Sequence, residues 1–238
     1  SMAYDFNGDS TYTNEERRQC AMKNAVNNFI SAVNAKYSPE ADHRIALVTF
    51  ESKASTLQDW TTVDNDGKTA LQEKVNGLSN TPAGATNAGA GMATAESLMG
   101  RDDHYMGDNT TRQKVVVLFT DGVPTTRSDF DTGVADSAIK SAKHLKDTGV
   151  TVYSVGIFNG ANPDELYGAK WGYMLHKDIS CDGNVGSYWG SSWLSSLFGS
   201  NDFEGIDIAA GNRFLNYLSS NFVSATNCGL ERGSFNPG

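Results

Sequence analysis

The stretch from Lys114 to Gly122 constrains the fold of this chain more than any other. It reads Lys-Val-Val-Val-Leu-Phe-Thr-Asp-Gly, five apolar residues followed by a threonine, an aspartate and a glycine. A continuous β-branched and aromatic run is typical of a strand covered on both faces, as in a parallel sheet between helices. Asp121 therefore ends a buried strand, at the edge where open α/β sheets bind ligands. A competing interpretation is that Asp121 only opens a turn, because Asp-Gly is a common turn pair.

Helical and strand patterns alternate along the first two thirds of the chain. A capping box at Thr13 and Glu16 is expected to start the first helix. Strands are predicted over residues 44–51, 54–61, 115–119 and 150–157, the first two as a hairpin. Apolar residues at helical spacing predict helices around 22–33, 71–78, 88–99 and 134–145, and a last one through Leu215, Leu218 and Phe222. This order predicts an α/β fold, a Rossmann-like and mostly parallel sheet flanked by helices. The tail to Gly238 is expected to be loop.

A long aromatic-rich insertion is predicted at 159–211, after the strand that ends at Ile157. It has little periodicity, and three of the four tryptophans lie in it. A connection of this length inside a compact domain is usually a functional excursion or a small subdomain. Its rings either form their own satellite core or include ligand anchors, for which Tyr188, Trp189 and Trp193 are the candidates.

The length of 238 residues fits a single domain, 1–238, with the insertion within it. A sheet of this kind normally begins with a central strand before the first helix, whereas this chain opens in a loop. No closing helix is recognisable after Cys228. We therefore expect the first strand and the last helix to lie outside the chain. Of the three cysteines, Cys181 and Cys228 are the better candidates for a disulfide.

Composition and missing motifs exclude several functions. The net charge of -9 argues against nucleic-acid and anionic-membrane partners, and no apolar run approaches the length of a membrane span. No Gly-x-Ser-x-Gly turn or general base accompanies Asp121, so we predict no enzyme and no catalytic residues. The four histidines lack zinc spacing. A calcium loop at Asp5, Asn7, Asp9 and Glu16 is disfavoured because Ser10 replaces the glycine that such a loop needs.

The segments Phe119 to Pro124 and Gly84 to Gly91 resemble the von Willebrand factor type A domain, and the resemblance covers residues 1 to about 157. This family carries a metal-ion-dependent adhesion site built from an Asp-x-Ser-x-Ser motif, a threonine before a helix and the aspartate of a Thr-Asp-Gly turn. Thr86 and Asp121 match the last two, and Ser1 matches the second serine. The aspartate and first serine of the motif are absent from this sequence. The narrower likeness is to type A domains of Gram-positive pilus-tip adhesins.

The resemblance implies a metal site formed by Ser1, Thr86 and Asp121. Such oxygen ligands suit Mg²⁺, with Mn²⁺ or Ca²⁺ as alternatives, and an acidic side chain from a partner would complete the coordination. Thr86 has a second interpretation as a helix cap, a role for which Asn87 competes.

The implied partners are an extracellular host-matrix or cell-surface protein and pilus shaft subunits. The implied location is the bacterial surface or a cell-wall-anchored pilus. Alternatives are an intracellular interaction module that docks on an ATPase and, with less support, a metal-dependent hydrolase.

Overall fold

The structure is a computed structural model, and it describes residues 2–5, 13–39, 42–101, 113–121, 124–126, 131–157, 214–215, 218–219, 221–226 and 229–231. The helices in these ranges are α1 (Arg18–Asn34), α2 (Asn65–Asn76), α3 (Ala88–Met99) and α4 (Thr132–Asp147). The strands are β1 (Arg44–Phe50), β2 (Ala54–Thr62), β3 (Val115–Thr120), β4 (Thr151–Gly156), β5 (Asn221–Thr226) and β6 (Gly229–Glu231). The predicted order from the first helix to the strand after α4 is confirmed.

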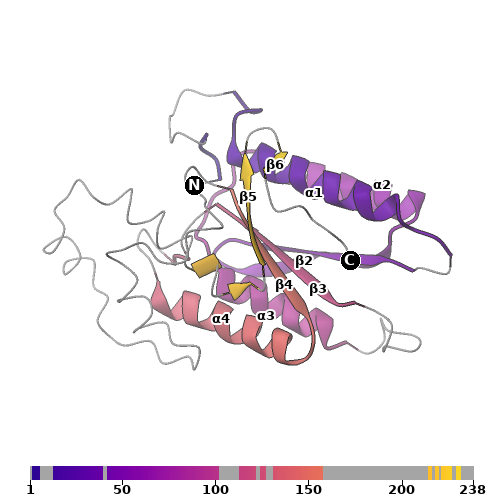
Figure 1. The fold of residues 1–238 in the computed structure, drawn as a ribbon. Helices are drawn as coiled ribbons and strands as arrows, with labels where there is room; N and C mark the ends of the chain where they lie inside the picture. The colour runs from indigo at the N-terminus through magenta and orange to yellow at the C-terminus, as the bar shows by residue number, and fades with distance from the viewer. Residues whose placement is uncertain are drawn as a thin grey trace, which may run out of the picture.

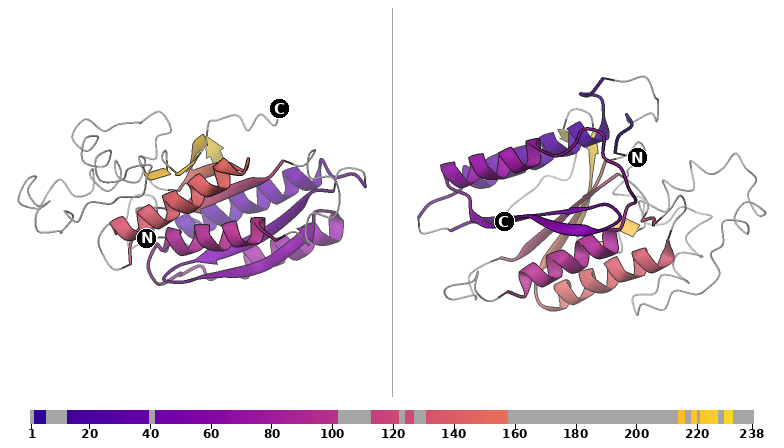
Figure 2. Two further views of the ribbon diagram at one scale, coloured as in Figure 1. Left: turned by 90° about the horizontal axis from the view of Figure 1, so that it is seen from below. Right: turned by 180° about the vertical axis from the view of Figure 1, so that it is seen from behind.

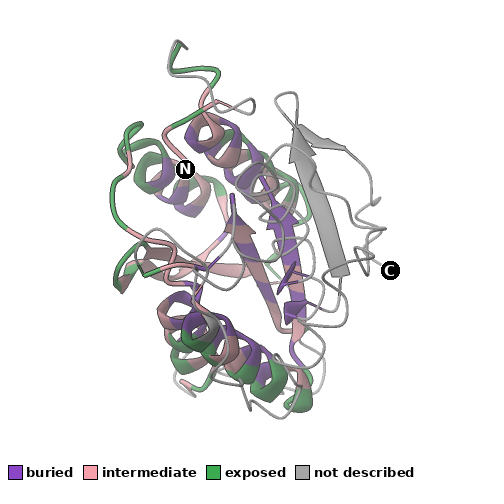
Figure 3. Ribbon diagram, turned by 90° about the vertical axis from the view of Figure 1, so that its left-hand side faces the viewer, coloured by how far each residue is buried: buried purple, intermediate pink, exposed green. Residues whose placement is uncertain are grey.

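The helices cover the strands from two sides. Helices α1 and α2 lie together on one face, and α3 and α4 lie together on the other (Figure 1). The views from below and from behind show the same layers (Figure 2). In each helix the buried residues face the strands and the exposed residues face outward (Figure 3). The predicted α/β layering is confirmed.

The expected single sheet is divided into two among the described residues. Strands β3, β4, β5 and β6 form one sheet in that order, and β1 and β2 form a separate antiparallel pair. The β3–β4 and β4–β5 pairs are parallel, whereas β5–β6 is antiparallel. The mostly parallel arrangement therefore holds for one sheet only. The reason is that no described strand lies between β1 and β3 to join them.

Two predictions for the end of the chain were wrong. Phe222 does not continue a helix, because it lies in β5, where it pairs with Ser154 of β4. The tail beyond it is not all loop, since β5 and β6 occupy parts of it. The spacing of Leu215, Leu218 and Phe222 fits a helix, but pairing with the open edge of β4 decides the conformation of the last of the three.

The first helix begins later than its capping box predicted. The Glu16 carboxylate does accept hydrogen bonds from the Thr13 backbone N–H and hydroxyl, at 2.7 and 3.0 Å. These residues form turns that precede α1, which begins at Arg18. The predicted contact is therefore present, but it closes a turn before the helix.

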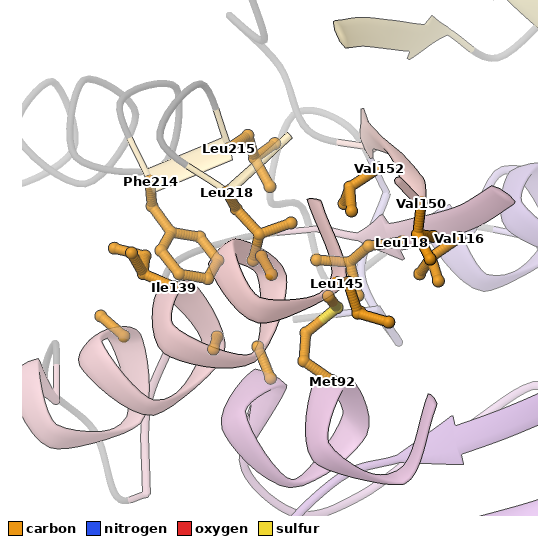
Figure 4. Close-up of a cluster of buried hydrophobic side chains, with 14 residues drawn as sticks. Met92, Val116, Leu118, Ile139, Leu145, Val150, Val152, Phe214, Leu215 and Leu218 are labelled. Atoms are coloured by element: carbon orange, nitrogen blue, oxygen red, sulfur yellow. The ribbon is translucent and has the colours of Figure 1, made fainter. Parts of the chain in front are cut away.

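The largest core cluster lies between the strands and the α3–α4 face. Phe214 packs beside Ile139 of α4, while Leu118 of β3 meets Met92 of α3 (Figure 4). Phe214 is fully buried, which contributes roughly 1.5 to 3 kcal/mol relative to leaving it exposed. The second core cluster places Val26 and Ile30 of α1 against the other face. Both faces of β3 are therefore covered, as its apolar run predicted.

Candidate functional site

Asp121 immediately follows β3 and is buried, with 4% of its surface exposed. Backbone hydrogen bonds between β3 and β4 continue to the end of β3, where the Ile157 backbone N–H donates to the Thr120 carbonyl at 2.8 Å. The Arg18 guanidinium lies beside the carboxylate, with Nη1 3.7 Å from Oδ2. Burying an ionised carboxylate costs several kcal/mol unless charge or hydrogen bonds compensate. Asp121 is thus a buried carboxylate beside a cation, at the carboxyl end of β3.

Thr86 precedes α3 but does not cap it. Asn87 is the cap, since its Oδ1 accepts a hydrogen bond from the Ala90 backbone N–H at 3.0 Å. Thr86 instead pairs through its backbone with Thr125, with N···O distances of 3.0 and 3.1 Å. This bridge ties the loop of Thr86 to residues just beyond Asp121. The competing interpretation of Thr86 as a helix cap is therefore wrong, and its hydroxyl is not committed to that role.

The loop that carries Thr86 also meets the end of β1. The Asn87 backbone N–H donates to the Glu51 carbonyl at 2.7 Å. Gly84 has φ of 111°, and a Cβ there would lie 1.9 Å from Glu51 Oε2. Only glycine combines that backbone conformation with so close an approach. The loop is therefore fitted against the Glu51 side chain.

Glu51 is a further acidic residue at this edge, and sequence reasoning missed it as a site residue. Hydrogen bonds from the Ser52 backbone and hydroxyl lower the pKa of Glu51, outweighing the raising effect of desolvation. The group is therefore ionised at neutral pH. The signal that would have found it is its position as the first acidic residue after an apolar strand, which is also the position of Asp121.

Asp131 fixes the segment that follows Asp121. Its carboxylate caps α4 by accepting from the backbone N–H groups of Gly133 and Val134 at 2.9 and 3.1 Å. It also accepts from the Thr126 hydroxyl at 2.5 Å, the main reason that the pKa of Asp131 is lowered. The Asp131 backbone N–H donates to the Pro124 carbonyl at 2.8 Å. Residues 124–126 are thereby tied to the start of α4 and held beside Thr86.

Glu51, Thr86 and Asp121 all line one cavity, which opens between β1 and β3. Together they offer two carboxylates and a hydroxyl, hard oxygen donors of the kind that Mg²⁺ and Ca²⁺ prefer. The described residues contain no group of three or more histidine, cysteine, aspartate and glutamate side chains suited to a metal. The chemistry of these oxygens, rather than a measured distance between them, is that of a hard-cation site with few anionic ligands.

Several predicted residues lie outside the described residues. These are Ser1, the insertion 159–211 with Tyr188, Trp189 and Trp193, and the cysteines Cys181 and Cys228. Met2, the neighbour of Ser1, is described. Its carbonyl accepts a hydrogen bond from the Gln19 backbone N–H at 2.9 Å, and Met2 packs against the cluster of Ala21, Val155 and Ile157. Cys20, the one cysteine within the described ranges, is free. No helix in those ranges is long and apolar enough to cross a membrane.

Comparison with known proteins identifies the fold. The family model of the von Willebrand factor type A domain matches residues 9–169, more than half of the chain. Domains of this family are typically interaction modules without enzymatic activity, which points to a role in adhesion or interaction. No curated protein sequence matches the chain.

Several solved structures are similar to the chain at low sequence identity. The PilB minor pilin from Streptococcus sanguinis shares its fold and is 17% identical, with a TM-score of 0.53 over 87% of this chain and 59% of its own. The von Willebrand domain of the type V pili tip protein Mfa5 from Porphyromonas gingivalis is 16% identical, with a TM-score of 0.45 over 89% and 83%. The proximal thread matrix protein 1 of the mussel byssus is 20% identical, with a TM-score of 0.42 over 58% and 32%. The chain thus spans about a third of the mussel protein and three fifths of the pilin.

Proposed function

Because this chain belongs to the von Willebrand factor type A family, we propose that it is an adhesion domain that binds a protein ligand through a divalent metal ion. The observation that supports the proposal is the bridge between Thr86 and Thr125, which ties the loop before α3 to the segment that follows Asp121. Thr86 and Asp121 both line the long cavity that runs between β1 and β3. The cap role of Asn87 leaves the Thr86 hydroxyl available for this purpose.

Thr86 and Asp121 are the described residues that would hold the metal, and we propose Ser1 as a third ligand. The ion is Mg²⁺, with Mn²⁺ or Ca²⁺ as substitutes. When bound with few anionic protein ligands, such an ion attracts an acidic side chain from another protein. Asp121 supplies the negative charge, and the Thr86 hydroxyl supplies a neutral donor. Arg18 opposes metal binding, because its guanidinium already lies beside the Asp121 carboxylate.

We extend the proposal to the partner and the location of the longer protein. Its ligand is an extracellular matrix or cell-surface protein that presents an aspartate or glutamate. Tyr188, Trp189 and Trp193 of the insertion serve as anchors for that ligand. The fold shared with a protein named as a minor pilin supports a place on a pilus at the bacterial surface, in contact with shaft subunits.

Retention on coated surfaces tests this function. The chain is applied to a panel of extracellular-matrix proteins in Mg²⁺ or in EDTA, beside an Asp121→Asn variant and an Asp66→Asn control. Asp66 is exposed on α2, away from the cavity. We expect retention that needs Mg²⁺, that is lost in Asp121→Asn and that persists in Asp66→Asn, without turnover of the retained protein. Retention that is equal in EDTA, or cleavage of the coated protein, would contradict the proposal.

A further inference from the structure

The turn between β1 and β2 is bonded to the loop that carries Thr86. The Ala85 backbone N–H donates to the Ser52 hydroxyl oxygen at 3.2 Å. The Asn87 backbone N–H donates to the Glu51 carbonyl at 2.7 Å. These two donors are the residues immediately before and after Thr86. The hairpin turn therefore holds the chain on both sides of this threonine.

The backbone of Thr86 itself is bonded to a different segment. Its N–H donates to the Thr125 carbonyl at 3.0 Å, and its own carbonyl accepts from the Thr125 N–H at 3.1 Å. Residues 124–126 are in turn tied to α4 through Asp131. Thr86 is thus held between two segments, the hairpin turn and the segment that follows Asp121.

The Ser52 hydroxyl is the part of the turn's support that depends on a side chain. The Glu51 acceptor is a backbone carbonyl, which any residue would supply. The same is true of the Ser52 carbonyl, which accepts from Asn87 Nδ2 at 3.2 Å. The Ser52 hydroxyl also donates to the Glu51 carboxylate. Because a hydroxyl can donate one hydrogen bond and accept others, it serves Glu51 and Ala85 together.

Close packing limits the movement of the loop in the other direction. A Cβ at Gly84 would lie 1.9 Å from Glu51 Oε2, so even this glycine lies close to the turn. The bond from Ala85 to Ser52 opposes movement away from the turn. A functional side chain works best when it is held to within about 0.5 Å of its productive position. The two restraints together supply such a position for the residue that follows Ala85.

We propose that Ser52 is a positioning residue for the Thr86 hydroxyl. By accepting the Ala85 N–H, it fixes where that hydroxyl lies and so strengthens the binding of a divalent metal ion, which Ser52 itself does not contact. This inference rests on the proposed function, because it takes the Thr86 hydroxyl as a metal ligand.

Calorimetric titration of Mg²⁺ into matched serine variants tests the proposal. Ser52→Ala should weaken Mg²⁺ binding by roughly fivefold, the equivalent of one hydrogen bond. Ser52→Thr keeps a hydroxyl and should bind as the original protein does. Ser55→Ala is the control, because the Ser55 hydroxyl bonds within the same hairpin, to the Thr49 hydroxyl at 3.2 Å. It should change the affinity by less than about twofold.

A double-mutant cycle shows whether Ser52 acts through Thr86. In a Thr86→Val protein the hydroxyl to be positioned is gone, so adding Ser52→Ala should weaken Mg²⁺ binding no further. A general distortion of the site would instead add its full effect to that of Thr86→Val.

Hydrogen exchange of the metal-free protein gives a readout that needs no Mg²⁺. The Thr86 amide should exchange roughly tenfold faster in Ser52→Ala than in Ser55→Ala, because its loop has lost one of its two supports. Unchanged exchange of this amide, equal Mg²⁺ affinity in Ser52→Ala and the original protein, or full additivity with Thr86→Val would overturn the inference. Faster exchange without Mg²⁺ binding in the original protein would instead refute the proposed function, and Ser52 would then support the loop without a role in metal affinity.

Discussion

The guanidinium of Arg18, the first residue of α1, lies 3.7 Å from the carboxylate of Asp121, the residue that follows β3. Arg18 also donates from Nε to the Asp5 carbonyl at 2.9 Å and from its backbone N–H to the Tyr4 carbonyl at 2.9 Å. One residue thus balances the site carboxylate and fixes the segment before the helix. A metal ion at Asp121 would compete with this guanidinium for the same negative charge.

Replacing Arg18 separates its structural role from its effect on metal binding. In Arg18→Gln the buried carboxylate loses its counter-charge, so the free energy of unfolding without metal should fall by about 2 to 3 kcal/mol. Mg²⁺ should recover part of the loss and should bind more tightly than in the original protein. Urea unfolding with and without Mg²⁺ measures both effects. Arg17→Gln is the control, because Arg17 donates to the Ala3 carbonyl and to Asn14. Equal Mg²⁺ dependence in both variants would contradict the prediction.

Thr86 and its neighbour Asn87 should respond in opposite ways to substitution. Thr86→Val keeps the shape of the side chain but removes the hydroxyl, so it should weaken Mg²⁺ binding with little change in stability. Asn87→Ala removes the cap of α3 and should cost about 1 kcal/mol of stability while leaving Mg²⁺ binding largely intact. Calorimetric titration and urea unfolding of the two variants test this pair. If Thr86→Val leaves the binding heat unchanged, the hydroxyl is not a ligand.

The Asp131 carboxylate, which caps α4, should make the free energy of unfolding depend on pH. Its pKa is lowered in the folded protein, chiefly by the Thr126 hydroxyl, from an ordinary value of 3.8. The contribution is therefore fully present above pH 3.8 and is lost as the pH falls through the lower folded value. Asp131→Asn keeps a capping side chain but cannot ionise. The stability advantage of the original protein over this variant should be constant at neutral pH and should shrink below about pH 3.8. An advantage that does not change on acidification would refute this assignment.

Lys23 joins α1 to the loop after α2. Lys23 is 7% exposed, and its ammonium donates to the Asn76 carbonyl at 3.1 Å, to Asn80 Oδ1 at 2.7 Å and to the Leu78 carbonyl. Burial lowers the pKa of Lys23, an effect only partly offset by Cys20.

Lys23→Met leaves these oxygens without their donor and should lower the free energy of unfolding by about 2 kcal/mol. Lys36→Met, at an exposed position beyond the end of α1, should change it by less than about 0.5 kcal/mol. Urea unfolding of both variants provides the measurement, and equal losses would show that the buried contacts of Lys23 add nothing.

The sequence predicted those parts of the fold that depend on local pattern. The apolar run of β3 and the helical spacing of Met92 and Ala138 report burial directly, and the structure confirms the elements they mark. Phe222 was assigned wrongly because its conformation is decided by pairing with β4, a contact distant in sequence. The start of α1 was assigned wrongly because Thr13 and Glu16 make the same contact in a turn as in a capping box.

The candidate site was only partly predictable for the same reason. Asp121 is recognisable because it ends an apolar strand. Thr86 could not be separated from Asn87 as a cap by sequence, since either side chain can accept the helix N–H groups. The approach of Arg18 to Asp121 and the fit of Glu51 against Gly84 join residues far apart in the chain. Neither the hydrophobic periodicity nor a short motif of the sequence predicts contacts of this kind.

Calorimetric titration of Mg²⁺ into the 238-residue chain tests the central claim most directly. The original protein is compared with Asp121→Asn, which keeps the shape of the side chain, and with Asp66→Asn, which changes the same charge at an exposed position on α2. Our account predicts a saturable binding heat in the original protein and in Asp66→Asn, and its loss in Asp121→Asn. The same heat in all three proteins, or none in the original protein, would contradict a metal site at Asp121.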